Sequence, residues 1–265
     1  MKLKLSISNT FASIQNRCAL VPFITAGDPN LNVTKKALNI LAEQGADIIE
    51  LGFPYSDPLA DGPTIQAASS RALQNHITVD QILKMVKELT QEISTPLVAF
   101  TYYNLVINKG ISKFVIQIKS AGFKGLLVPD LPLEEIDILE KECRHNNIEL
   151  ILLISPNTSS KRIQKILKKA HGCVYLVSST GVTGMGFKPK ESLLSLIKYI
   201  KSTKKTSLVV GFGISTQEDI QLVQSWGVDG IVMGSAFVNK LFESSDDPEL
   251  SSFKTYCAYI KGSFS

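Results

Sequence analysis

The sequence is poor in several residue types on which common kinds of site depend. Of its 28 basic residues only four are Arg, and it has three His, four Cys and one Trp. Because base readout relies on the paired donors of Arg, we expect no nucleic-acid partner, and the Lys-rich stretch 161–169 is better explained as a solvated helix face. The His residues form no HxH or HExxH motif, so we expect no metal site.

The cysteines and the hydropathy pattern bear on location. The four cysteines include no CxxC pair, and a chain of 265 residues does not need disulfides to fold, so reduced thiols are expected. No run of 18 apolar residues occurs, and the first 17 residues contain no apolar signal core. We therefore expect a cytoplasmic protein that neither spans nor binds a membrane.

Short apolar runs alternate with amphipathic stretches along nearly the whole chain. The runs predict strands buried on both faces, as parallel strands are, at 19–25, 47–52, 96–102, 125–130, 149–155, 173–178, 207–212 and 229–234. Helical periodicity is found at 31–45, 78–93, 110–122, 133–146, 159–170, 191–203, 216–226 and 248–261, and an extra helix is expected at 7–17. This order predicts an α/β fold, a single (β/α)₈ TIM barrel domain over 1–265; an open doubly wound sheet is the alternative.

Carboxylates stand where such a barrel would have its working face, at the carboxyl ends of the strands. Glu50 lies inside the apolar run IIELG, where burial should raise its pKa and suit it to proton transfer; a structural Glu bound to a loop is an equal alternative. The loop that follows carries Asp57 and Asp61 between three prolines. Either Asp could also be a turn former or a helix cap.

Glycines gather after the sixth, seventh and eighth expected strands. They are Gly181 and Gly184, Gly211 and Gly213, and Gly234, which precedes Ser235. Glycine exposes backbone N–H groups, and the last two βα loops of these barrels often hold phosphate. Aromatic residues near strand ends could wall a flat apolar pocket beside the carboxylates. Together these features suggest a reaction on a phosphorylated aromatic substrate without metal or cofactor.

Several motifs together resemble the tryptophan synthase alpha subunit family. The longest is IELGFPYSDPLADGPTIQ, and the others follow in the family's order along the chain. They are residues 49–66, 22–29, 102–104, 129–132, 178–184, 211–215 and 234–236. The resemblance implies a barrel that cleaves indole-3-glycerol phosphate to indole and glyceraldehyde 3-phosphate.

The resemblance also implies roles for particular residues. Glu50 corresponds to the general acid/base, Asp61 to the acceptor of the indole N–H, and Tyr175 to a residue near the reacting carbon. The indole pocket corresponds to Phe23, Phe100, Tyr102, Leu127, Leu153 and Phe212, with Thr183 in a lid at 179–190 that contacts the Asp61 region. The phosphate site corresponds to Gly184, Gly213, Gly234 and Ser235.

A partner is implied as well. Members of the family work with a beta subunit that carries pyridoxal phosphate, usually as an α₂β₂ heterotetramer, and the alpha subunit itself needs no cofactor. The contact side corresponds to Asp57, Pro58, Asn104 and Pro132. Two alternatives are a free-standing indole-3-glycerol phosphate lyase, which would have the same motifs, and a mainly regulatory activator of a beta subunit. The regulatory activator should have lost Glu50 or Asp61, and both are present.

Overall fold

The computed structural model describes residues 6–14, 16–177, 191–203, 206–211 and 213–264. Parallel strands pair in sequence order, and β8 pairs with β1, so the sheet closes into a barrel. The expected (β/α)₈ fold is therefore confirmed and the open sheet is wrong. The strands are β1 Ala19–Thr25, β2 Ile49–Gly52, β3 Leu97–Phe100, β4 Gly125–Leu127, β5 Glu149–Ile154, β6 Cys173–Val177, β7 Ser207–Gly211 and β8 Gly230–Met233.

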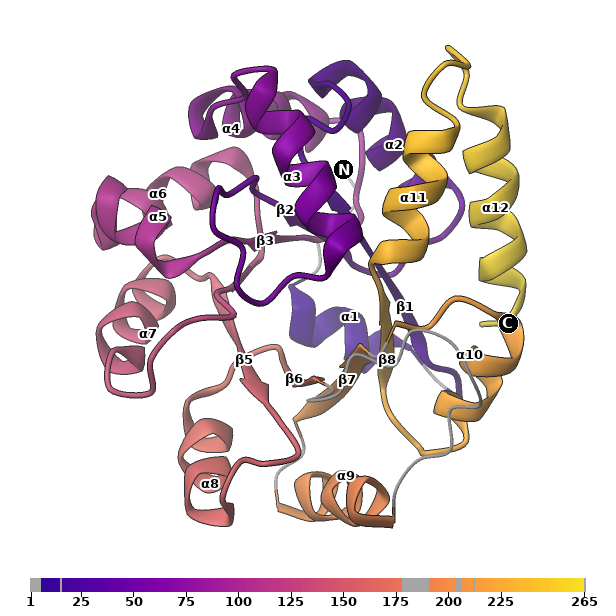
Figure 1. The fold of residues 1–265 in the computed structure, drawn as a ribbon. Coiled ribbons are helices and arrows are strands. Elements are labelled where there is room, and N and C mark those ends of the chain that lie inside the picture. The colour runs from indigo at the N-terminus through magenta and orange to yellow at the C-terminus, as the bar shows by residue number, and fades with distance from the viewer. Residues whose placement is uncertain (1–5, 15, 178–190, 204–205, 212, 265) are drawn as a thin grey trace.

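Helices surround the strands (Figure 1). They are α1 Ile7–Ser13, α2 Leu31–Glu43, α3 Pro63–Gln74, α4 Val79–Leu89, α5 Tyr103–Lys109, α6 Ile111–Ala121, α7 Ile136–His145, α8 Ser160–Lys169, α9 Glu191–Thr203, α10 Gln217–Gln224, α11 Ser235–Glu243 and α12 Ser251–Gly262. Among the described residues, no helix is both long and apolar enough to cross a bilayer.

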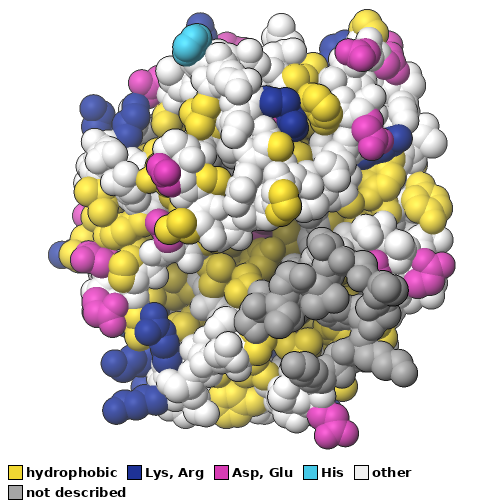
Figure 2. Space-filling model, viewed as in Figure 1, with side chains coloured by type: hydrophobic (Ala, Val, Ile, Leu, Met, Phe, Trp, Pro, Cys, Tyr) yellow, Lys and Arg dark blue, Asp and Glu magenta, His cyan; other side chains and the backbone are white. Residues whose placement is uncertain are grey.

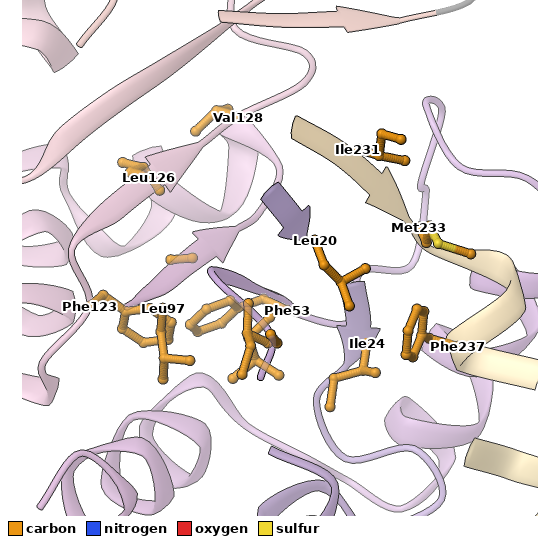
Figure 3. Packing of buried hydrophobic residues seen from close by; sticks show 14 of the residues in the cluster. Leu20, Ile24, Phe53, Leu97, Phe123, Leu126, Val128, Ile231, Met233 and Phe237 are labelled. Carbon is orange, nitrogen blue, oxygen red and sulfur yellow. The ribbon is translucent and has the colours of Figure 1, made fainter. Parts of the chain in front are cut away.

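Two layers of apolar side chains follow from the alternation along each strand. One set points outward and packs under the helices, as Leu20 and Ile24 of β1 do beside Phe237 of α11 (Figure 3). The other set fills the barrel interior, where Ile7 and Phe11 of α1 pack against the inward residues of the strands. The N-terminal helix therefore packs against the barrel interior, and the working cavity lies at the carboxyl ends of the strands.

Several expected boundaries are wrong for local reasons. The helix expected over 7–17 ends at Ser13, since Ile14 is extended and Asn16 has a φ of 59°. The strand expected over 125–130 ends at Leu127, before a turn at Pro129, which has no N–H for the ladder. The last helix begins at Ser251 and not at 248, since Leu250 has a φ of 50°.

A short helix was missed altogether. The strand expected over 96–102 ends at Phe100, and Tyr102 is instead the N-cap residue of α5. Helix α5 has only seven residues and is separated from α6 by Gly110, whose φ is 84°. Seven residues are too few for helical periodicity to stand out in a sequence.

The Lys-rich stretch behaves as expected. In α8 the apolar residues Ile163, Ile166 and Leu167 are buried, and the basic residues of this helix are exposed or half-buried. Lys and Arg side chains accordingly gather over α8 in the space-filling view (Figure 2).

Candidate active site

Glu50 is held inside the barrel by the strand that carries it. It lies on β2 opposite Phe23 of β1 and Val98 of β3, and it is 2% exposed. Burial penalises the charged carboxylate and raises the pKa of Glu50 to about 8. At neutral pH the group is therefore mostly protonated and can act as a general acid.

A cavity of about 240 Å³ opens at the carboxyl ends of the strands. It brings together ten residues expected from the sequence: Glu50, Asp61, Tyr175, Phe23, Phe100, Leu127, Leu153, Gly213, Gly234 and Ser235. The other described lining residues, which sequence reasoning had not assigned to the pocket, are Ala60, Gly62, Ile65, Pro129, Val177, Gly211 and Val232. Thr183, Gly184 and Phe212, and the proposed lid at 179–190, lie outside the described residues.

Tyr102 was also expected to line the indole pocket. It is 2% exposed, yet it is not among the residues that line the cavity. Its hydroxyl accepts a hydrogen bond from the backbone N–H of Ala60, at 3.0 Å.

Asp61 ends the proline-rich loop after β2 and faces the same cavity as Glu50. Its backbone N–H donates to the carbonyl of Pro58 at 3.1 Å, and α3 begins two residues later. Burial raises the pKa of Asp61 to about 6, against the opposing effect of the hydrogen bond from Tyr102. At neutral pH Asp61 is therefore mostly ionised and can accept a hydrogen bond.

The two carboxyl groups are consequently in opposite states near pH 7. Glu50 holds its proton below about pH 8, and Asp61 has lost its proton above about pH 6. Pairs of acids whose surroundings set different pKa values commonly divide the roles of acid and base. This cavity can therefore donate a proton from one wall and stabilise a positive charge at another.

Tyr175 lies on β6 and depends on a glycine in the neighbouring strand. Burial raises the pKa of Tyr175 well above its usual value, so the phenol stays neutral. A Cβ atom at Gly211 of β7 would overlap the Tyr175 hydroxyl.

For this reason we expect Gly211→Ala to displace the Tyr175 ring. Overpacking in a tight interior typically costs about 1–3 kcal/mol of stability. Thermal unfolding should show that loss, and kcat/KM should fall as well. Gly262→Ala is a matched control, because a Cβ there meets nothing within 4 Å. An unchanged unfolding temperature for Gly211→Ala would contradict the close approach of residues 175 and 211.

The far end of the cavity is built from backbone. Gly213 follows β7 with a φ of 65°, a conformation that favours glycine. Gly234 follows β8 as the N-cap of α11, which begins at Ser235, so the N–H groups of the first turn of α11 lie at this end. Exposed N–H groups at a helix N-terminus suit an anion such as phosphate.

A second cavity, of about 560 Å³, lies beside the first. It is formed by β4, β5, α7 and α8 and shares Pro129, Leu153 and Val177 with the first. Its described lining residues include no Asp, Glu, His or Cys. The described residues also contain no group of three or more His, Cys, Asp or Glu that could hold a metal.

The residues expected to meet a partner lie on an outer face. Asp57, Asn104 and Pro132 are exposed and Pro58 is half-buried. Leu59, in the same loop, is 90% exposed.

Comparison with known proteins adds independent evidence. A family model described as Tryptophan synthase alpha chain matches residues 11–262. The chain belongs to the tryptophan synthase alpha chain family. The Tryptophan synthase alpha chain of Pyropia yezoensis is 50% identical over 256 residues, which cover 97% of each chain. That of Acaryochloris marina is 49% identical over 260 residues, again 97% of each.

Solved structures of this family have the same fold. The tryptophan synthase alpha-subunit of Pyrococcus furiosus matches with a TM-score of 0.85 at 34% identity, over 94% of this chain and 100% of that one. Tryptophan synthase from M. tuberculosis matches with a TM-score of 0.87 at 27% identity, over 97% and 98%. The tryptophan synthase alpha chain match at 11–262 contains every described residue that lines the catalytic cavity.

Proposed function

We infer that this chain is the lyase of the alpha reaction of tryptophan biosynthesis, the cleavage of indole-3-glycerol phosphate to indole and glyceraldehyde 3-phosphate. The observation that carries the inference is the pair of carboxyl groups, Glu50 and Asp61, whose pKa values of about 8 and about 6 leave them in opposite states in one aromatic-walled cavity. We infer that residues 1–265 act as one catalytic domain.

Glu50 is proposed to move the protons of the reaction. The protonated carboxyl delivers a proton to carbon 3 of the indole ring, which makes the ring a cationic electron sink. The carboxylate so formed removes the proton of the hydroxyl next to the ring. The bond between carbon 3 and the side chain then breaks, its electrons restore the indole ring, and the hydroxyl-bearing carbon becomes the aldehyde of glyceraldehyde 3-phosphate.

Asp61 is proposed to stabilise the cationic intermediate. Its ionised carboxylate accepts the indole N–H, and this interaction strengthens as positive charge develops on the ring. Phe23 and Phe100 meet edge to face, with ring centroids 5.2 Å apart, and offer a wall for the ring. Tyr175 would lie near the reacting carbon, beside Leu127 and Leu153.

The phosphate is proposed to bind at the glycine-rich end of the cavity, at Gly213, Gly234 and Ser235. Replacement of Gly213 by Val should obstruct this end and strain the backbone, because the φ of 65° disfavours a branched side chain. We expect KM for indole-3-glycerol phosphate to rise about tenfold or more, with a smaller change in kcat. Steady-state kinetics measure both, and an unchanged KM would remove Gly213 from the phosphate site.

A beta subunit is the proposed partner. The tryptophan synthase complex of Pyrococcus furiosus contains a chain with the same fold, at a TM-score of 0.85 and 33% identity. We propose an α₂β₂ assembly in which Asp57, Pro58, Asn104 and Pro132 meet the beta subunit, which carries the pyridoxal phosphate while this chain uses no cofactor. A cytoplasmic location is also proposed, and the four cysteines are free and buried, as suits a reducing compartment.

The deciding experiment measures indole release from indole-3-glycerol phosphate by the purified chain, with and without a beta subunit. We expect indole in both cases and faster release with the beta subunit present. Full activity alone, with no response to the beta subunit, would favour a free-standing lyase. Activation of the beta subunit without any indole release would favour a regulatory role, and the absence of both effects would refute the proposal.

A further inference from the structure

The second cavity, of about 560 Å³, has one apolar side and one polar side. The apolar side is built from β5 and β6, the loop after β4, α7 and Ile166 of α8. The polar side is a single segment that runs from the end of β5 into the first turn of α8, and its lining residues are Ser155, Asn157, Thr158, Ser159 and Arg162. Ligand sites typically have a volume of about 300–1,000 Å³ and a mostly apolar lining with a few polar groups. The cavity therefore has the size and the lining of a site for a small amphipathic molecule.

Hydrogen bonds within the polar segment fix its shape. The Thr158 hydroxyl accepts the backbone N–H of Ser155 at 3.0 Å, and the Thr158 N–H donates to the Ser155 carbonyl at 2.9 Å. The Ser159 hydroxyl caps α8 by accepting the backbone N–H of Arg162 at 3.4 Å. The backbone that carries Arg162 is therefore held in the first turn of α8, at the polar side of the cavity.

Arg162 is the one charged residue among the described residues that line this cavity. Within the described part of the chain, each of the other three arginines pairs with a carboxylate, whereas Arg162 has no ion pair there. The guanidinium group presents paired donors that match the two oxygens of a carboxylate. One positive charge beside neutral hydroxyl groups suits a monoanion better than a doubly charged phosphate.

We propose that the second cavity binds a small monocarboxylate with an apolar body, whose carboxylate pairs with Arg162 and whose body lies on the apolar side. The catalytic cavity is not the place for such an acid, because its described lining residues include two acids and no Lys, Arg or His. The two cavities share Pro129, Leu153 and Val177, so the bound acid contacts the wall of the catalytic cavity from outside. Binding here does not depend on the proposed function, since it needs neither Glu50 nor Asp61.

The test is titration calorimetry of the full chain with octanoate, and with octanamide, which has the same apolar body but no charge. We expect saturable binding of octanoate at one site and weaker binding of octanamide. Arg162→Gln should weaken octanoate binding about tenfold, as expected for the loss of a hydrogen bond to a charged group, and should leave octanamide binding unchanged. Lys165→Gln is the matched control in the same helix, because Lys165 is exposed and does not line the cavity.

Two further variants show where the acid binds. Leu133 is half-buried and lines the second cavity, so the larger side chain in Leu133→Trp should fill the cavity and prevent octanoate binding although Arg162 is retained. Gly213→Val obstructs the proposed phosphate end of the catalytic cavity, and it should leave the Kd for octanoate unchanged.

Several results would overturn the proposal. Octanoate that does not bind, or that binds no better than octanamide, would show that the cavity is not a carboxylate site. An unchanged Kd in Arg162→Gln or Leu133→Trp would place the acid outside the second cavity, and a loss in Gly213→Val alone would place it in the catalytic cavity. An equal loss in Lys165→Gln would show a nonspecific attraction to the basic face of α8.

Discussion

Glu50→Gln is expected to lower the rate of indole release by roughly 10²–10⁴-fold, the usual contribution of general acid–base catalysis. The carboxamide has nearly the shape of the carboxyl group but cannot exchange a proton with the substrate. Substrate should still bind, because Gln removes neither the aromatic wall nor the phosphate site. Single-turnover kinetics and equilibrium binding of the substrate separate the two effects. Glu88→Gln on exposed α4 is the control.

The same variant is expected to be more stable than the unaltered protein at alkaline pH. Burial raises the pKa of Glu50 from 4.5 to about 8, so the folded protein keeps a proton that the unfolded chain has released. The stability of the unaltered protein should therefore fall as pH rises from about 4.5 to about 8, by an amount on the order of several kcal/mol from this group. Gln carries no such penalty.

Urea unfolding at pH 5 and pH 8 measures the difference directly. A variant that gains stability at pH 8 while it loses activity cannot have lost activity by unfolding. Near-normal turnover in Glu50→Gln would reject the catalytic assignment, whereas equal pH dependence of stability in both proteins would reject the buried, protonated state of Glu50.

Most of the fold could be predicted from the sequence, because each strand is an apolar run between amphipathic stretches. Glu50 stood out for the same reason, as a carboxyl group within such a run. Strand and helix ends were less predictable, because they depend on single backbone conformations such as those of Asn16 and Leu250. No local sequence pattern predicts that these particular residues will adopt a positive φ.

Contacts across the barrel could not be predicted from local pattern. Tyr102 follows β3 and accepts a hydrogen bond from Ala60 in the loop after β2, and the need for Gly211 follows only from the position of Tyr175 on the neighbouring strand. An apolar strand predicts that an aromatic residue is buried, but not whether its hydroxyl faces the cavity or a loop. For this reason the sequence could not show that the Tyr102 hydroxyl would bond the loop at Ala60.

The support of the catalytic loop is also assembled from distant segments. Arg71 of α3 forms a bidentate pair with buried Asp28, at 2.7 and 2.8 Å. Its guanidinium lies 3.9 Å from the ring centroid of Phe242 in α11. These contacts connect α3, which follows Asp61, to the loop after β1 and to α11, which begins at Ser235. The elements that carry Asp61 and Ser235 are therefore connected through Arg71.

Asp61→Asn is expected to lower kcat by roughly 10²–10³-fold, which is typical for the loss of one group that stabilises developing charge. Asn has the size of Asp and can still accept the indole N–H, but it has no negative charge to oppose the positive charge on the ring. The acidic limb near pH 6 should also disappear, since the group whose pKa burial raises to about 6 is gone. Rate–pH profiles test both effects.

Asp80→Asn, whose surface pair with Lys109 lies on α4 and α5, is the matched control for the loss of one carboxylate. A kcat within a few-fold of the unaltered value in Asp61→Asn would show that ring charge is stabilised elsewhere. The combined Glu50→Gln and Asp61→Asn variant makes the argument stricter. If both groups act in the same protonation step, the rate losses should be far from multiplicative, because once proton transfer is abolished there is little cationic intermediate left for Asp61 to stabilise.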